Sequence, residues 1–194
     1  MPQQSSPISD LVRPELAELG VYAPLAGDFT IRLDANEAPA LLSASARARL
    51  AEVAGSTAWQ LYPDARSAHL REAIAAKTGV GADEVFAGVG SDEVIATLLT
   101  ALVRPRVKNL VPTVLTTTPS FVMYRQSARA RGLNVIEVPL DAEWDLAESS
   151  MLKALEMTPP NVVFIATPNN PTGNLMSRDR LERVIQAAAG ALVV

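Results

Sequence analysis

The sequence predicts an α/β fold with three layers, in which helices cover both faces of a mainly parallel sheet. Short apolar segments alternate with segments of helical periodicity through the second half of the 194 residues. The clearest apolar segment is Val162–Ala166, whose unbroken hydrophobicity is typical of a strand buried on both faces. The connections between segments are short, which favours right-handed crossovers between parallel neighbours.

The composition excludes several classes of protein. A hydrophobic content of 48% and a charged content of 20% are typical of a globular chain with a substantial core. The net charge of −4, with no basic cluster, argues against a nucleic-acid-binding surface. The absence of cysteine excludes disulfides and thiolate metal sites, and the single histidine, His69, cannot form a histidine-based metal site. No apolar segment is long enough to span a bilayer, so we expect no membrane partner. The lack of cysteine fits a reducing compartment, and we expect a cytoplasmic protein.

The first third of the chain predicts few core elements. A short helix is expected around Glu15–Leu19 and a strand-like piece at Ile31–Asp34. A helix over Ala44–Val53 would be capped by a preceding serine, Ser43 or Ser45, and stopped by Gly55. In the loop that follows, Pro63 forces Tyr62 into an extended conformation, so its phenol is presented from a loop.

A glycine-rich junction follows in the predicted larger part of the fold. A helix over Ser67–Thr78, ended by Gly79, precedes a short strand at Asp83–Ala87. The loop Gly88–Gly90 then leads into a helix over Val94–Val103. Glycines and a helix N-terminus together favour binding of a phosphate, although a turn that binds nothing is the alternative. The segment matches neither the dinucleotide-binding fingerprint nor the Walker loop.

The alternation of strands and helices continues to the last residue. Phe121 and Tyr124, three residues apart, are expected on one face of a helix. The remaining predicted strands and helices are, in order, strand 109–116, helix 121–131, strand 134–139, helix 145–157, strand 162–166, helix 178–189 with Ser177 as its cap, and strand 191–194.

The polar loop Thr167–Gly173 interrupts this alternation directly after the most apolar strand. Pro168 and Pro171 prevent either a strand or a helix from continuing through it. The loop is therefore held at the carboxyl end of a central strand, where open α/β sheets bind their ligands. Asn169 and Asn170 can each donate and accept hydrogen bonds there, although an ordinary turn is the alternative.

Five segments in order carry a resemblance to a known family: LDANEAP, YPD, GVGSDE, TPSFVMY and TPNNPTG. Together they resemble fold-type I aminotransferases, which use pyridoxal phosphate, and within these they look most like histidinol-phosphate aminotransferases. The resemblance covers Ile31 to Val194. It implies an N-terminal arm over 1–30, the start of a small domain and a linker over 31–65, and over 66–194 a large domain like that of aspartate aminotransferase, incomplete at its C-terminus.

The resemblance also implies a cofactor site for pyridoxal 5′-phosphate. Ser91, Asp92 and Glu93 would hold its phosphate at the helix N-terminus. Tyr124 would stack on the pyridine ring, and Asn170 would donate a hydrogen bond to the phenolic O3′. No metal is implied.

Three further residues receive roles from the same resemblance. Tyr62 would cross the interface of a homodimer to the phosphate of the partner's cofactor. Asn36 and Glu37 would lie near the entrance for the substrate. The bond between Asn170 and Pro171 is expected to be cis, a form that is accessible before proline.

The activity implied is transamination of L-histidinol phosphate with 2-oxoglutarate, giving imidazole-acetol phosphate and glutamate in histidine biosynthesis. An aromatic aminotransferase, a threonine-phosphate decarboxylase and an inactive truncated paralogue that serves as a dimerisation partner are the alternatives. The chain stops in the apolar run ALVV, so we expect the family's catalytic lysine and pyridine-nitrogen aspartate beyond Val194. None of Lys77, Lys108 and Lys153 lies in a matching motif, and we expect the isolated chain to be inactive.

Overall fold

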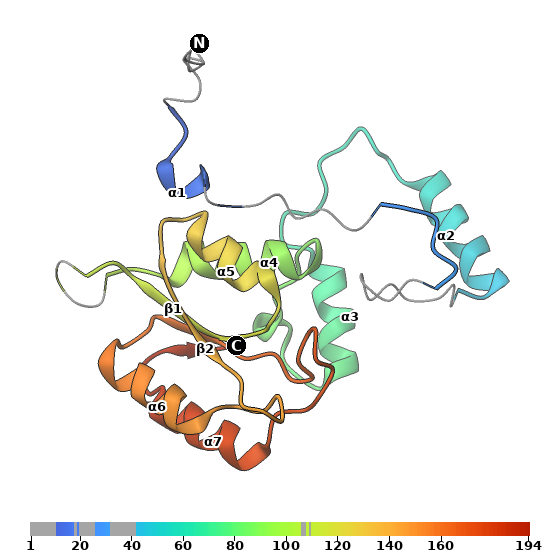
Figure 1. Cartoon of the computed structure of the whole chain (residues 1–194). Coiled ribbons are helices and arrows are strands. Elements are labelled where there is room, and N and C mark those ends of the chain that lie inside the picture. The colour runs from blue at the N-terminus through green and yellow to red at the C-terminus, as the bar shows by residue number, and fades with distance from the viewer. Residues whose placement is uncertain (1–10, 18, 20–25, 32–41, 106–107, 109) are drawn as a thin grey trace, which may run out of the picture. The chain divides into compact units, whose positions relative to one another are not determined.

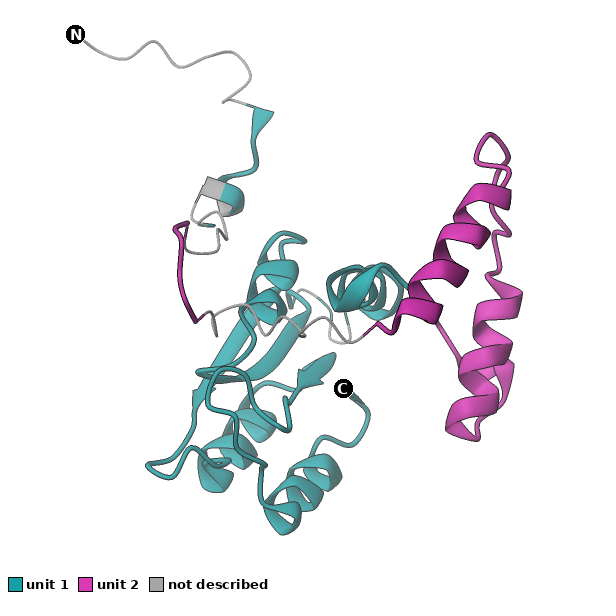
Figure 2. Cartoon of the chain, turned by 90° about the vertical axis from the view of Figure 1, so that its right-hand side faces the viewer, with its two compact units in different colours: residues 1–20, 88–194 teal, residues 21–87 magenta. Residues whose placement is uncertain are grey.

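The computed structural model describes residues 11–17, 19, 26–31, 42–105, 108 and 110–194. The chain divides into two compact units, one formed by residues 1–20 and 88–194 and the other by residues 21–87 (Figure 2). These boundaries differ from the predicted domain boundary between residues 65 and 66, and the assignment of residues 66–87 to a large domain stays a prediction.

The larger unit is built on a parallel sheet. Its strands run in the spatial order β2-β1-β3-β4, and every neighbouring pair is parallel (Figure 1). The predicted parallel α/β architecture is therefore confirmed. The strands are β1 (Thr113–Thr118), β2 (Asn134–Pro139), β3 (Val162–Phe164) and β4 (Leu192–Val193).

Helices cover both faces of this sheet and bury two separate apolar clusters. On one face lie α4 (Gly90–Leu102) and α5 (Val122–Arg129), and on the other lie α6 (Glu148–Met157) and α7 (Arg178–Ala187) (Figure 1). Successive residues of a strand point to opposite faces, so neighbours in β1 and β3 enter different clusters. The first cluster contains Ile95, Leu99, Val114, Ala128, Val162 and Phe164. The second contains Leu115, Val138, Leu146, Met151, Leu155, Val163, Ile165, Met176, Val184 and Ala188.

The remaining elements are helical. The larger unit also contains the short α1 (Pro14–Ala17). The smaller unit contains α2 (Ala44–Ser56), α3 (Ala68–Thr78) and the 3₁₀ turn η2 (Ala82–Glu84). Among the described helices none is long and apolar enough to cross a membrane.

Two expectations for the helices of the smaller unit are confirmed at their caps. Ser43 is the N-cap of α2, where its hydroxyl accepts a hydrogen bond of 3.1 Å from the amide of Ala46. Gly79 ends α3 in the left-handed conformation, with its amide donating to the carbonyl of Ala75 at 2.8 Å.

The prediction that Gly55 stops α2 is wrong, because the helix continues to Ser56. Side chains that follow the glycine occupy the last carbonyl groups of the helix. The hydroxyl of Thr57 donates to the carbonyl of Val53 at 2.7 Å, and the indole of Trp59 donates to that of Ala54 at 2.9 Å. These bonds satisfy orphan acceptors that a glycine cap would otherwise serve.

The predicted strand at Asp83–Ala87 is also wrong, because this segment starts as η2 and then runs extended without a partner strand. The carboxylate of Glu84 accepts from the amide of Gly81 at 2.7 Å, which closes the turn. The guanidinium of Arg71 donates to the carbonyls of Val85 and Ala82 at 2.8 and 2.5 Å. A side chain therefore satisfies backbone acceptors that a strand would have paired in a sheet.

Element boundaries in the larger unit shift by a few residues. The strand predicted from residue 109 begins at Thr113, directly after Pro112, which cannot donate to a sheet ladder. The helix predicted from Asp145 begins at Glu148, because the carboxylate of Asp145 instead accepts from the amides of Leu146 and Ser177. Ser177 is the N-cap residue of α7 without a side-chain capping bond. The strand predicted at 31–34 lies mostly outside the described residues.

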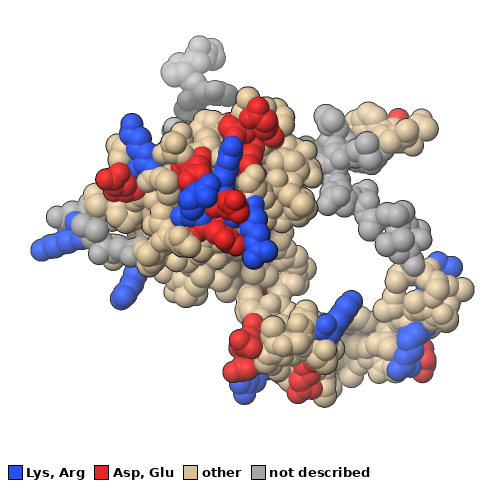
Figure 3. Space-filling view, turned by 90° about the horizontal axis from the view of Figure 1, so that it is seen from below, with Lys and Arg blue, Asp and Glu red and all other residues tan. Residues whose placement is uncertain are grey.

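Ion pairs join α7 to α6 and to the turn that precedes α6. The guanidinium of Arg183 binds both carboxylate oxygens of Glu148 at 2.6 and 2.8 Å. Arg180 pairs with Asp141 and lies 3.4 Å from the carboxylate of Asp145. Figure 3 shows basic and acidic side chains interspersed on this face rather than gathered by sign. Hydrogen bonds from the arginines lower the pKa of the carboxyls of Glu148 and Asp141 below their ordinary values.

The lowered pKa of Glu148 predicts that the contribution of this residue to stability depends on pH. A carboxyl whose pKa is depressed by folding stabilises the fold above its ordinary pKa of 4.5, and the contribution is lost as pH falls through the folded value. Glu148→Gln should therefore lower the urea midpoint at pH 7 and have little effect at pH 3. The matched control is Glu156→Gln on the same helix, since Glu156 is exposed and has no ion pair among the described residues. Equal effects of both variants at pH 7 would contradict the assignment.

Candidate functional site

The loops that follow β1 and β3 are joined at the carboxyl edge of the sheet. Asn169, in the loop after β3, is 2% exposed. Its side-chain amide donates to the carbonyl of Pro119 at 3.1 Å and to the hydroxyl of Thr172 at 2.7 Å. Its side-chain oxygen accepts a hydrogen bond of 3.3 Å from the hydroxyl of Ser120. The loop after β3 is therefore tied to the junction between β1 and α5.

Asn170, the next residue, is in the opposite situation. It is exposed, and its side chain makes no hydrogen bond with any described residue. The bond between Asn170 and Pro171 is cis, which confirms the expectation from the sequence. An amide with two donors and one acceptor is thus available to a ligand at the carboxyl edge of a parallel sheet.

An aromatic group of three rings lies beside this edge. The ring of Tyr124 stacks on that of Phe164, with centroids 4.6 Å apart and an interplanar angle of 5°. Phe121, at the N-cap of α5, meets Tyr124 at 87° with centroids 5.5 Å apart. One face of Tyr124 is therefore already covered by a core residue. Burial raises the pKa of the Tyr124 phenol, so the hydroxyl stays protonated at neutral pH.

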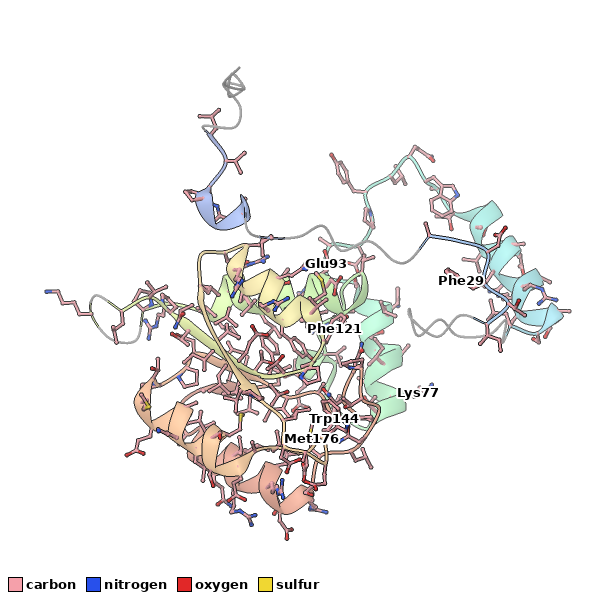
Figure 4. The ribbon with its side chains drawn as sticks, in the orientation of Figure 1. Phe29, Lys77, Glu93, Phe121, Trp144 and Met176 are labelled. Atoms are coloured by element: carbon pink, nitrogen blue, oxygen red, sulfur yellow. The ribbon has the colours of Figure 1, made fainter. Side chains whose placement is uncertain are left out.

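The start of α4 carries the three residues predicted to hold a phosphate. Ser91, Asp92 and Glu93 all lie in its first turn and are exposed. Figure 4 shows Glu93 at the start of α4 and Phe121 at the start of α5, the two helices that cover one face of the sheet. α5 begins at the carboxyl edge, because it connects the parallel strands β1 and β2 and returns antiparallel to them. α4 lies beside it, and Arg131, just after the end of α5, donates to the hydroxyl of Thr100 near the end of α4 at 2.9 Å.

The first turn of α4 fits a phosphate through its backbone more than through its acidic side chains. Gly90 has a φ of +77°, and no described atom lies within 4 Å of the position that a side chain would take there, so the described residues leave the backbone open to a ligand. The carboxylate of Glu93 accepts a hydrogen bond from the amide of Val89. Two carboxylates repel a phosphate dianion, so the amides of the turn and the hydroxyl of Ser91 are the groups suited to bind it.

The other predicted site residues lie outside the described part of the larger unit. Tyr62 belongs to the smaller unit, where its side chain is fully exposed, with a relative exposure of 102%. Asn36 and Glu37 lie outside the described residues. The roles predicted for these three residues stay predictions.

The resemblance assigned Asn170 to the cofactor and gave Asn169 no role, so the structural role of Asn169 was not predicted. The signal that could have indicated it is the nearby hydroxyl of Thr172, since asparagine side chains commonly bond neighbouring groups in turns. Phe121 was expected only to share a helix face with Tyr124. Its position at the N-cap, at the edge of the sheet, makes it a second aromatic candidate.

The described residues of the larger unit form no metal site, and their lysines lie outside the segments at the carboxyl edge of the sheet. The described residues include no cluster of three or more histidine, aspartate or glutamate side chains suited to a metal ion. Lys153 is exposed on α6, and Lys108 is exposed between α4 and β1. Lys77 lies in the last turn of α3, in the smaller unit.

Comparison with protein families gives one domain match. The family described as aminotransferase class I and II matches residues 30–194. Among curated proteins, the chain is 39% identical over 188 residues to a histidinol-phosphate aminotransferase of Chromobacterium violaceum, covering 96% of the chain and 51% of that protein. It is 42% identical over 187 residues to histidinol-phosphate aminotransferase 1 of Burkholderia mallei, covering 95% and 51%. The chain thus spans about half the length of the curated relatives that it matches.

Solved structures with the same fold include two aminotransferases. The histidinol-phosphate aminotransferase of Sinorhizobium meliloti in complex with pyridoxal-5′-phosphate has a TM-score of 0.74 at 21% identity, covering 94% of this chain and 49% of that one. The N-succinyldiaminopimelate aminotransferase of Mycobacterium tuberculosis has a TM-score of 0.62 at 30% identity, covering 76% and 40%.

The contact between Glu93 and Val89 predicts that Glu93 stabilises the start of α4. Glu93→Ala should lower the free energy of unfolding by about 1 kcal/mol, the usual cost of losing a side-chain cap. Asp92→Ala is the matched control, because the described residues give Asp92 no side-chain hydrogen bond, and it should cost less than half as much. Urea denaturation of the two variants measures the difference, and an equal loss would show that Glu93 acts through its charge alone.

Proposed function

The chain belongs to the class I and II aminotransferase family, and on that basis we propose that it serves pyridoxal-phosphate-dependent transamination by binding the cofactor at the carboxyl edge of its sheet. The observation that carries the proposal is Asn170, an exposed amide that bonds no described residue and lies on a loop tied to the start of α5. Such a group is suited to donate to the phenolic O3′ of the cofactor.

Each part of the proposed site has a separate task. The first-turn amides of α4 and the hydroxyl of Ser91 bind the phosphate, while Glu93 holds the turn in shape through Val89. Phe121 and Tyr124 restrict the ring from one side, with Phe164 fixing the orientation of Tyr124. When bound, pyridoxal phosphate withdraws electrons from the carbon that carries the amino group. The residues of this chain then orient the ring and keep its phenolic oxygen hydrogen-bonded.

We propose L-histidinol phosphate and 2-oxoglutarate as the substrate pair. The support is the name shared by curated relatives that are 39% and 42% identical to the chain. The 30% identity to an N-succinyldiaminopimelate aminotransferase favours a second candidate, transamination of another amino donor on the same fold. Comparing the rates of several amino donors with any enzyme that contains this chain distinguishes the two, because only the first candidate requires a preference for L-histidinol phosphate.

We also propose a cytoplasmic homodimer. The full exposure of the Tyr62 phenol supports a role outside its own unit, and the absence of cysteine is typical of a reducing compartment. Sedimentation velocity tests the dimer, which a purely monomeric enzyme at micromolar concentration would contradict.

Asn170→Ala should weaken binding of pyridoxamine 5′-phosphate to the 194-residue chain about tenfold, the cost of one hydrogen bond to a ligand. This probe lacks an aldehyde and does not react with lysines. The matched control is Asn134→Ala, an exposed asparagine at the start of β2 and thus at the opposite edge of the sheet. Titration calorimetry measures both. Loss of affinity in the control alone, or in neither variant, would contradict the role of Asn170.

We expect the chain by itself to hold the cofactor without a covalent bond. Its three lysines are all exposed, and none lies in the segments that form the proposed site. Treatment with pyridoxal phosphate and borohydride should therefore give labelling well below one equivalent, spread over several lysines, with no transamination. Mass spectrometry measures the labelling, and one stoichiometric lysine adduct accompanied by turnover would refute this expectation.

A further inference from the structure

We infer that Asn169 is a positioning residue, which orients Asn170 toward the cofactor without itself touching any ligand; this inference rests on the proposed function. The two asparagines are adjacent, yet one is buried and the other exposed. Asn170 begins the turn that the amide of Gly173 closes on the carbonyl of Asn169 at 2.7 Å, so anchoring Asn169 fixes the point from which Asn170 projects.

The hydrogen-bonding groups of Asn169 are fully used inside the protein. Its side-chain nitrogen donates to Pro119 and Thr172, and its side-chain oxygen accepts from Ser120. Its backbone amide donates to the carbonyl of Asn174 at 2.8 Å, and its carbonyl accepts from the amide of Gly173 at 2.7 Å. A residue with these partners has no donor left for a ligand.

The hydrogen bonds of Asn169 continue through Thr172 and Asn174 to Trp144. The hydroxyl of Thr172 accepts from Asn169 and donates to the side-chain oxygen of Asn174 at 2.5 Å. The side-chain nitrogen of Asn174 donates to the carbonyl of Trp144 at 2.8 Å. This polar chain links the loops that follow β1, β3 and β2. Aligned hydrogen bonds of this kind polarise and strengthen one another.

Asn170 lies between two residues whose side chains are hydrogen-bonded, Asn169 and Thr172. Asn169 precedes it, and Pro171 and Thr172 follow it, so its backbone cannot turn without breaking contacts on one side or the other. Asn169→Ala releases the loop from the start of α5 and leaves Asn170 and the aromatic rings chemically unchanged. If that variant loses its preference for a ligand with a phenolic oxygen, the cause is therefore the changed orientation of Asn170.

The test compares two probes, pyridoxamine 5′-phosphate and its analogue without the 3-hydroxyl. Their affinity ratio isolates the hydrogen bond of Asn170 from phosphate binding and from general stability. Asn170→Ala should lower the ratio about tenfold, and Asn169→Ala about fivefold. The double variant should fall no lower than Asn170→Ala alone, because the two residues act through one contact. Thr172→Ser should retain the native ratio, and Thr172→Val should lower it.

The matched control is Asn161→Ala. Asn161 also bridges two segments, accepting from the amide of Thr113 at 3.1 Å and donating to the carbonyl of Arg104 at 2.7 Å, but at the opposite end of β3. Asn161→Ala should lower the free energy of unfolding and leave the affinity ratio of the two probes within twofold of the native value. If Asn161→Ala lowers the ratio as much as Asn169→Ala, the effect is general loosening and the inference is overturned. It is likewise overturned if Asn169→Ala keeps the native ratio.

A second readout separates this inference from the proposed function. In Asn169→Ala the amide of Gly173 should exchange with solvent at least tenfold faster, and the side-chain amide signals of Asn170 should shift; neither should change in Asn161→Ala. If the native chain binds neither probe, or binds both equally, the proposed function fails while these NMR signals still decide the positioning. Unchanged signals in Asn169→Ala would overturn it.

Discussion

The burial of one polar side chain constrains the whole carboxyl edge of the sheet. An amide group removed from water destabilises a fold unless its donors and acceptor find partners, and Asn169 finds them on two different loops. The loop after β3 must therefore meet the start of α5 in one arrangement. The exposed Asn170, the aromatic rings and the polar chain to Trp144 all depend on that arrangement.

The sheet provides the frame in which this constraint can act. Its parallel strands place every following loop at one edge, and the two apolar clusters hold a pair of helices against each face. The ion pairs of Arg180 and Arg183 secure the far face, where α6 and α7 meet. The candidate site is thus built from the ends of rigid elements, while the groups that would touch a ligand come from short loops between them.

Periodicity and local turn chemistry account for what the sequence predicts well. The alternating strand Asn134–Pro139 and the glycine after Thr78 are found where they were predicted, because both depend on neighbouring residues. Errors in the predicted elements arise where side chains distant in the sequence bind the backbone. The carbonyl of Val85 is taken by Arg71, and no local pattern shows that contact. The stacking of Phe164 on Tyr124 is equally invisible in a local pattern, and the role predicted for Tyr124 stays a prediction. For the same reason the structural role of Asn169 was not predicted, although the resemblance assigned Asn170 to the cofactor.

The central claim is that one small aromatic phosphate binds where the start of α4, the start of α5 and the loop after β3 converge. Titration of the isotope-labelled chain with pyridoxamine 5′-phosphate, followed by NMR, tests it most directly. The account predicts saturable shifts in three groups of signals: the amides of Ser91 and Asp92, the rings of Phe121 and Tyr124, and the side chain of Asn170. Shifts confined to α6 and α7, or saturation without any change at Asn170, would contradict it.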